Sequence, residues 1–149
     1  MPVDPSFAGR EYPPSEPYPV SAVKIREFAD AVNDPNPAYR SLEAAQALGY
    51  RDVVAPPTFA IVLTLPAGHQ FIADPDAGVD YSRVVHGEQR FVHVRPIQAG
   101  DVLRTTLTIE DIRVAAGNEI ITNRADVRTE DGELVTTAYS TIVVRGGAA

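Results

Sequence analysis

The sequence predicts an α+β fold in which helices and an antiparallel sheet occupy separate parts of the chain. Apolar residues recur at helical spacing within residues 21–72, whereas residues 83–145 alternate between apolar and polar side chains as β-strands do. Helices followed by a run of strands are typical of folds in which the helices pack on one face of an antiparallel sheet. At 149 residues, we expect a single domain over residues 1–149 with one hydrophobic core.

Composition excludes several classes of function. The chain has 13 basic and 20 acidic residues and a formal net charge of -7, which argues against nonspecific binding to nucleic acid or to an anionic membrane. It has no cysteine, so disulfides, thiolate metal sites and a cysteine nucleophile are excluded. No stretch approaches the ~18 apolar residues of a membrane span, and the first residues do not resemble a secretion signal. We therefore expect a soluble cytoplasmic protein.

The first part of the chain is expected to be extended and then helical. Residues 1–20 are rich in proline, which donates no ladder hydrogen bond, so this lead-in is expected to form at most an edge strand over residues 16–20. Ser21 is a good helix N-cap, and the helix it starts is expected to end before Pro35. This helix carries one apolar stripe that is expected to face the core: Ile25, Phe28, Ala29 and Val32.

The chain from Phe28 to Phe59 is the segment around which the rest is organised. The first helix breaks at Asp34-Pro35-Asn36-Pro37, and a short second helix is expected over Leu42–Leu48. The chain then enters residues 57–72, which are apolar on nearly every side and predict a buried helix. Acidic and amide side chains thus stand on a proline-stiffened loop between two packed elements, which is where binding or chemistry is expected.

The remainder is expected to form an antiparallel sheet. Strands are predicted over residues 83–94, 103–109, 119–129 and 134–145, with Asp131-Gly132 as a hairpin turn. Strict alternation in the first of these strands divides its side chains between two faces, with His86, Glu88 and Arg90 on one and Gly87, Gln89 and Phe91 on the other. Residues 146–149 are expected to be a frayed tail.

The loop resembles a known signature. Val32–Tyr39 is similar to the (R)-specific enoyl thioester hydratase/dehydratase motif of the MaoC-like family, small–Gly–Asp–any–Asn–Pro–aliphatic–His. The match is closer to the FAS1-like dehydratase N-terminal type, which includes small hydroxyacyl-ACP dehydratase subunits of fatty acid biosynthesis. Further segments stand in the family order, namely Val53–Phe59, Val85–Phe91, Arg95–Ile97 and Ala99–Asp101. The resemblance implies a single hot-dog fold, in which a bent antiparallel sheet wraps around a long central helix. Such a unit leaves one sheet edge and one helix flank uncovered, so we expect a dimer, whose geometry the sequence leaves open.

In that family an Asp and a His five residues later activate water, an Asn sets the loop, and a backbone amide at the start of the central helix stabilises the thioester oxygen. Asp34 and Asn36 match the Asp and the Asn, and we take them as candidate catalytic residues. The histidine position is Tyr39, whose hydroxyl ordinarily titrates near pH 10. Pro57 stands where the amide donor is expected and has no amide hydrogen, although Thr58 offers a donor one residue later.

These departures lead to one leading hypothesis and two alternatives. The chain is expected to be a subunit of a (3R)-hydroxyacyl thioester dehydratase or (R)-specific enoyl hydratase, acting on acyl-ACP or acyl-CoA beside a MaoC-like chain that supplies the dyad. The first alternative is a self-sufficient homodimeric hydratase that uses Asp34 with Tyr39 or His86. The second is an acyl-thioester binding protein without activity. The residues expected to contact substrate are Tyr39, Pro57, Thr58, Phe59, Val62 and His86.

Several of these residues can also be explained by purely structural roles. Asp34 and Asn36 are also common turn formers, because their side chains hydrogen bond to nearby backbone amides. His86 is also explained as a strand histidine bonded within the fold. His69 and His93 have no ligand at metal-binding spacing, so neither a metal nor a cofactor is expected.

Overall fold

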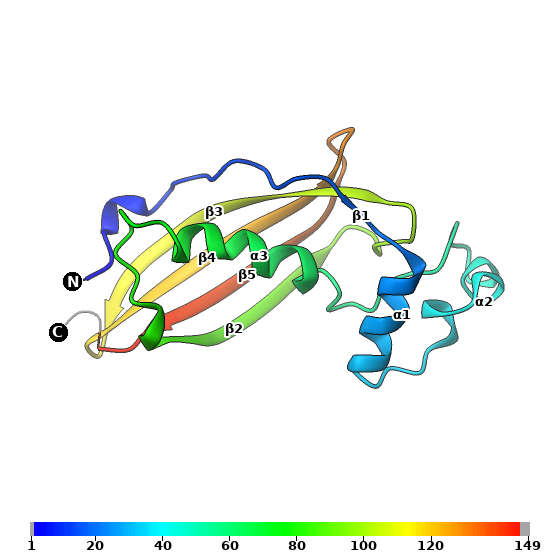
Figure 1. The fold of residues 1–149 in the computed structure, drawn as a ribbon, viewed down its shortest axis with the longest axis horizontal. Helices are drawn as coiled ribbons and strands as arrows, with labels where there is room; N and C mark the ends of the chain where they lie inside the picture. The colour runs from blue at the N-terminus through cyan, green and yellow to red at the C-terminus, as the bar shows by residue number, and fades with distance from the viewer. Residues whose placement is uncertain (1, 147–149) are drawn as a thin grey trace.

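The computed structural model describes residues 2–146 and contains, within them, one curled antiparallel sheet and three α-helices. The strands lie in the order β1-β3-β4-β5-β2, and every pairing is antiparallel. Helix α3 lies along one face of the sheet, while α1 and α2 lie together at one end of the molecule (Figure 1). The elements are β1 (Tyr18–Pro19), α1 (Ala22–Ala31), α2 (Leu42–Ala47), α3 (Ile61–Ile72), β2 (Val84–His93), β3 (Val102–Ala115), β4 (Asn118–Thr129) and β5 (Leu134–Val144).

The core lies between α3 and the concave face of the sheet. Alternate residues of β3 and β4 are buried, as expected for strands with one covered face. Towards the α1 end, Leu63 of α3 packs in one cluster with Leu103 and Val127. Towards the other end, Phe71 packs with Leu107, and its ring lies 6.1 Å from the Phe7 ring. The α+β class and the antiparallel sheet predicted from the sequence are therefore confirmed.

Helix α3 begins later than predicted. Apolar character alone placed its start at Pro57, but the α-helix runs only from Ile61. Residues 57–60 instead form tight turns, in which the amide of Ile61 donates to the carbonyl of Thr58 at 3.1 Å. The carbonyl of Pro57 faces a side chain of β2, so it is not part of the helical hydrogen-bond ladder. The two prolines thus belong to the approach to the helix rather than to its first turn.

The alternation predicted for β2 is wrong at one point. Pairing with β5 shifts register between His86 and Glu88, so Gly87 is the extra residue of a β-bulge. The bulge moves His86 onto the concave face together with Gln89, whereas Glu88 and Arg90 face the opposite, convex side. A Cβ at Gly87 would lie 3.3 Å from the carbonyl oxygen of Thr141, which explains the glycine there.

The proline-rich lead-in covers the outer edge of β3. Strand β1 is only two residues long, within the predicted range 16–20. Upstream of it, the amides of Gly9, Tyr12 and Ser15 donate to carbonyls of β3 at 2.7, 2.8 and 2.9 Å. A short 3₁₀ helix over Pro5–Phe7 was not predicted. At the other terminus, Gly146 donates its amide to Asn118 at 2.9 Å, and residues 147–149 of the expected frayed tail lie outside the described residues.

Replacing Phe59 with alanine tests how the α1 end is held to the sheet. Phe59 has 0% exposed surface, and its ring meets Phe28 of α1 edge-on at 5.5 Å. We expect Phe59→Ala to lower the free energy of unfolding by about 3–5 kcal/mol, because a buried ring is lost and a cavity remains. Urea denaturation measures this. Val23→Ala, at an exposed position of α1, is the control and should change the free energy by less than about 0.5 kcal/mol.

Candidate functional site

The loop after α1 is built from two consecutive side-chain caps. Asn33 adopts a left-handed backbone conformation with φ of 58°, which asparagine tolerates better than most residues. The Oδ1 atom of Asp34 then accepts from the amide of Asn36 at 3.2 Å, and Oδ1 of Asn36 accepts from the amide of Ala38 at 3.0 Å. The turn-forming role considered for both residues is therefore present. Asn36 nevertheless lines a cleft, and Asp34 stands two residues before it in the same loop.

Tyr39 lies beside Asp34. Its side chain is buried, with 8% of the residue exposed. Burial, the negative charge of Asp34 and hydrogen bonding to that carboxylate together raise the pKa of the Tyr39 hydroxyl above its ordinary value. Tyr39 therefore stays protonated at neutral pH and is a hydrogen-bond donor rather than a base.

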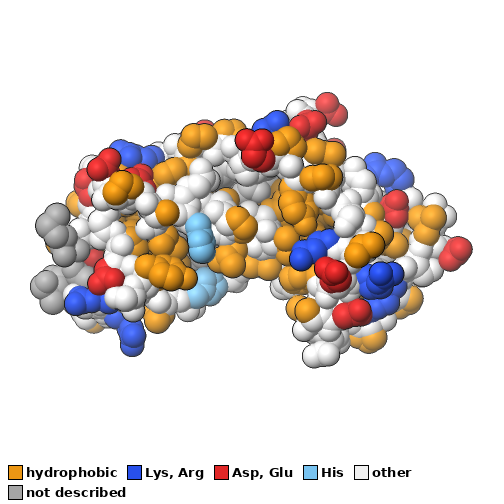
Figure 2. Space-filling model, in the orientation of Figure 1, with side chains coloured by type: hydrophobic (Ala, Val, Ile, Leu, Met, Phe, Trp, Pro, Cys, Tyr) orange, Lys and Arg blue, Asp and Glu red, His pale blue; other side chains and the backbone are white. Residues whose placement is uncertain are grey.

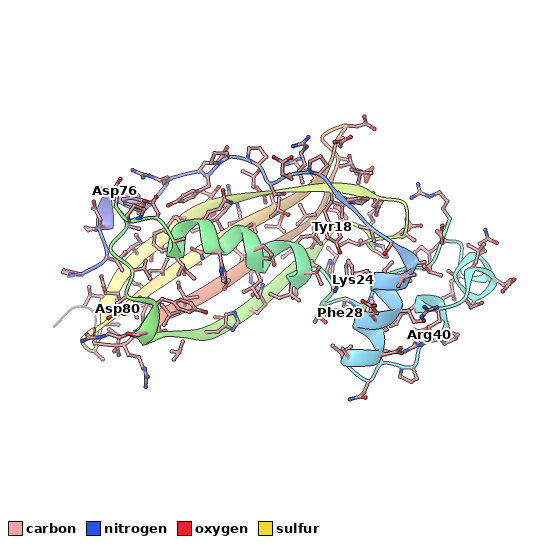
Figure 3. All side chains as sticks on the ribbon, viewed as in Figure 1. Tyr18, Lys24, Phe28, Arg40, Asp76 and Asp80 are labelled. Atoms are coloured by element: carbon pink, nitrogen blue, oxygen red, sulfur yellow. The ribbon has the colours of Figure 1, made fainter. Side chains whose placement is uncertain are left out.

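Arg40 fastens this loop to α1. Its guanidinium contacts the carboxylate of Asp30 at 2.7 Å and donates to the carbonyl of Asn36 at 3.1 Å. Figure 3 shows Arg40 beside α1, and Phe28 on the side of α1 that lies towards α3. The ion pair and the Phe28–Phe59 contact hold the loop from two sides, so the position of Asp34 is set by both.

A cleft of about 360 Å³ opens beside this loop. Its walls come from the loop after α1, the segment before α3 and the end of β2, and most of them are apolar. The polar side chains that line it are few, which is typical of small-molecule sites. They are Asn36, Tyr39, Tyr50, His93 and Arg95.

His93 is a residue of this cleft that the sequence analysis did not identify. Its Nε2 lies 2.8 Å from the carbonyl oxygen of Pro57, and its Nδ1 lies 2.9 Å from the hydroxyl of Thr136. A carbonyl oxygen can only accept, so Nε2 carries a hydrogen and donates, while Nδ1 faces the Thr136 hydroxyl, which also lies 3.3 Å from the carbonyl oxygen of Val92. Both ring nitrogens are thus engaged, and the ring stacks on Phe91 with 8° between the planes.

Arg95 closes the same end of the cleft. Its guanidinium binds the buried carboxylate of Asp101 through two nitrogens, at 2.9 and 3.1 Å, and its Nε contacts Glu133 at 2.6 Å. Asp101 also accepts from the amide of Gln98 at 2.8 Å. Two carboxylates therefore hold this arginine, and it serves to join the loop after β2 to the β4–β5 turn.

The predicted site residues do not all meet in one place. Asn36, Tyr39 and Pro57 line the cleft, and Asp34 lies against Tyr39. Thr58 is exposed and Phe59 is fully buried, and neither lines the cleft. Val62 lines a separate shallow groove against the lead-in, with Tyr18 among its walls.

His86 lies in another cavity, beneath α3. His93 stands seven positions further along the extended strand β2, a distance of roughly 20 Å. The structure therefore does not bring His86 to the cleft that Tyr39 lines.

Other kinds of site have little support. Among residues 2–146, no three His, Cys, Asp or Glu side chains gather in a way that could hold a metal ion. Across the same part of the chain, no helix is both long and apolar enough to cross a membrane.

The role of His93 as a clamp on Pro57 can be tested by hydrogen exchange. His93→Leu removes the donor to the Pro57 carbonyl and should loosen residues 57–60. We expect amide exchange in a peptide covering these residues to be roughly two- to tenfold faster, the effect of losing one ordinary hydrogen bond. The control is His86→Leu, a histidine of the same strand that makes no contact with this segment, and it should leave the exchange rate unchanged.

Comparison with known proteins places this geometry in context. A family model described as "FAS1-like, dehydratase domain region" matches residues 6–138. A UPF0336 protein of Saccharopolyspora erythraea is 56% identical over 148 residues, which cover 99% of this chain and 95% of that relative.

Among solved structures, a chain of the C-terminally truncated HadBC (3R-hydroxyacyl-ACP dehydratase) complex from Mycobacterium tuberculosis superposes with a TM-score of 0.85 at 35% identity. The match covers 96% of this chain and 99% of that chain. A protein described as a MaoC-like dehydratase also gives a TM-score of 0.85, at 34% identity. The match covers 94% of this chain and 42% of the chain of that protein. The hot-dog fold expected from the sequence is thereby confirmed.

Proposed function

The chain belongs to the FAS1-like dehydratase family of MaoC-like hot-dog proteins, and from this membership we propose that it is one subunit of a (3R)-hydroxyacyl thioester dehydratase or (R)-specific enoyl hydratase. In this proposal a single hot-dog domain binds acyl-ACP or acyl-CoA beside a second MaoC-like chain. That second chain supplies the Asp/His dyad.

The proposal depends on which groups in the cleft are able to act as acid or base. Adding water to an enoyl thioester needs a group that exchanges a proton with water near neutral pH. In the part of the chain described here, His93 is the one imidazole that lines the cleft, and Pro57 and Thr136 occupy its two nitrogens. Tyr39 keeps its proton. Asp34 is left without a partner of suitable pKa, so we expect the chemistry to depend on another chain.

The face on which that second chain docks is proposed to be the β2 side of the molecule. Strand β2 is the last strand of the sheet and pairs with β5 alone, so its outer edge is free within residues 2–146. Large apolar side chains are exposed on this strand, just after it and on the neighbouring flank of α3: Val85, Val92, Val94 and Leu65. A free edge with exposed apolar residues favours pairing with another strand.

Mixing experiments test the subunit role. We expect the chain to co-elute with a MaoC-like protein that carries the intact Asp and His, and to raise its hydration of trans-2-decenoyl-CoA by about tenfold or more. Leu65→Arg should abolish both effects, because it places a charge on the proposed docking face. Val23→Arg, on exposed α1, should not. If neither co-elution nor a change in rate is seen with the unaltered chain, the subunit role is wrong.

One observation favours the alternative of a self-sufficient hydratase, namely that Asp34 is near enough to Tyr39 to help raise the pKa of its hydroxyl. The two proposals differ in what Tyr39→Phe and Asp34→Asn do. If this chain holds the acid and base, each change should lower hydration about 10²- to 10⁴-fold.

In the subunit role, the chain alone shows no activity above background, and both variants leave the rate of the mixed complex within about tenfold. The loss of enoyl absorbance measures this rate. Asp76→Asn, in an exposed loop at the opposite end of the molecule from Arg40 (Figure 3), is the control for removal of a carboxylate.

A further inference from the structure

A second cavity lies beneath α3 and is separate from the cleft beside the α1–α2 loop. Its volume is about 60 Å³, and it lies between α3 and strands β3, β4, β5 and β2. Half of the residues that line it are aliphatic. The polar side chains that line it are Thr64, His69, His86, Gln89, Asn123 and Ser140. None of the residues that line it is a lysine, arginine, aspartate or glutamate.

Strand register gathers three of these polar side chains into one row. Gln89 of β2 pairs with Ser140 of β5, which in turn pairs with Asn123 of β4. On one side of the row lie the isoleucine pair Ile121 and Ile142, so the polar row interrupts an apolar face. On its other side the paired residues are the alanines Ala125 and Ala138, whose small side chains leave the space that forms the cavity.

Polar atoms in this cavity lack partners within the protein. The Oδ1 of Asn123, the Oγ1 of Thr64 and the Nε2 of Gln89 are all buried without a hydrogen bond. Asn123 is 5% exposed and Thr64 is 7% exposed, so neither reaches bulk water. Burying an unpaired polar group destabilises a fold, and native proteins pair most such groups. A bound ligand that supplies hydrogen-bond partners would explain why polar rather than apolar residues stand at these three positions.

The surrounding contacts define what kind of partner fits. The Nε2 of His86 lies 3.3 Å from Oε1 of Gln89, which turns the NH₂ end of the Gln89 amide away from His86 and leaves it as a free donor. The Oδ1 of Asn123 is a free acceptor, and the Thr64 hydroxyl can do either. A hydroxyl group both donates and accepts, so one hydroxyl satisfies Asn123 and Gln89 together. A phosphate or carboxylate would find no lysine or arginine among the lining residues.

We propose that this cavity binds a hydroxyl group carried on an uncharged alkyl chain. A volume of about 60 Å³ holds only a few heavy atoms, since about 10–15 Å³ of such volume holds one water. The occupant is therefore a short hydroxylated segment and not a whole lipid. This identification rests on the proposed function: the segment is part of the acyl chain of the substrate. The polar row then selects acyl chains that carry a hydroxyl group away from the thioester.

The opening of the cavity agrees with this occupant. His69 and His86 line it and are exposed, and Figure 2 shows two histidine side chains (pale blue) close together among hydrophobic side chains (orange). The exposed Leu65 of the proposed docking face also lines the cavity. A chain that enters from this face would pass apolar side chains before its hydroxyl reaches Asn123.

Small alcohols test the cavity directly. The probes are 2-butanol and 2-chlorobutane, which are similar in size and differ in the hydroxyl. In ¹H–¹⁵N spectra of the purified chain, we expect 2-butanol to shift the side-chain amide signals of Asn123 and Gln89. It should bind about fivefold more tightly than 2-chlorobutane, the effect of one hydrogen bond. The side-chain amide of Gln98, in the loop that carries Asp101, is the control signal and should not move.

Two variants separate binding from a merely structural role. Asn123→Leu should remove the preference for the alcohol and raise the melting temperature by a few degrees, because an unpaired buried oxygen is replaced by an apolar group. Thr64→Val keeps the shape of the side chain, removes one hydroxyl, and should also weaken alcohol binding. This variant serves as the test if Asn123→Leu does not fold.

Three outcomes overturn the proposal: no shift with 2-butanol, as for a cavity that holds only water; equal affinity for the two probes; or an unchanged preference in the variants that fold. The titration needs neither a partner nor turnover. A failure here therefore leaves the subunit proposal standing, and a failure of the mixing experiment leaves the cavity standing.

Discussion

The burial of α3 is the constraint on which the rest of the structure depends. Its sequence is apolar on nearly every side, and such a helix is stable only when most of its surface is covered. The curled sheet covers one side, and the lead-in, which bonds to β3, covers a second through contacts such as that of Phe7 with Phe71. Exposed Leu65 and Pro66 mark the side that these elements leave open. Both cavities described above lie at the borders of this helix, one at its beginning and one beneath it.

The loop after α1 shows how one set of side chains serves structure and chemistry together. Asp34 and Asn36 cap backbone amides, and the same geometry holds Asp34 beside Tyr39 and Asn36 at the cleft. Caps of this kind fix a carboxylate without burying it, so it remains open to a ligand. The weakness of the loop as a catalytic site lies elsewhere. Among residues 2–146, no imidazole with a free nitrogen lines the cleft, since Pro57 and Thr136 occupy the two ring nitrogens of His93.

Sequence reasoning found the elements whose signals are local. The Ser21 cap, the break before Pro35 and the strands after residue 83 depend on neighbouring residues, and the structure has them. The bulge at Gly87 was missed because alternation assumes one residue per step, and only the pairing with β5 reveals the extra residue. His93 was missed for a related reason. Its partner Pro57 is 36 residues away in sequence, and a hydrogen bond to a carbonyl leaves no pattern in side-chain identities.

The register of the sheet also explains why the cavity under α3 was invisible in the sequence. Asn123 alone reads as a polar residue of an alternating strand, and strict alternation placed Gln89 on the face opposite His86, whereas the bulge brings both to the concave face. These side chains form a row only because the register of three neighbouring strands aligns them. A subunit that leaves proton transfer to a partner is not required to keep an acid and a base at its own cleft. Under the proposed subunit role the chain must still match its ligand in shape and polarity, so the unpaired polar atoms of its core point to that ligand more directly than the departures at Tyr39 and Pro57 do.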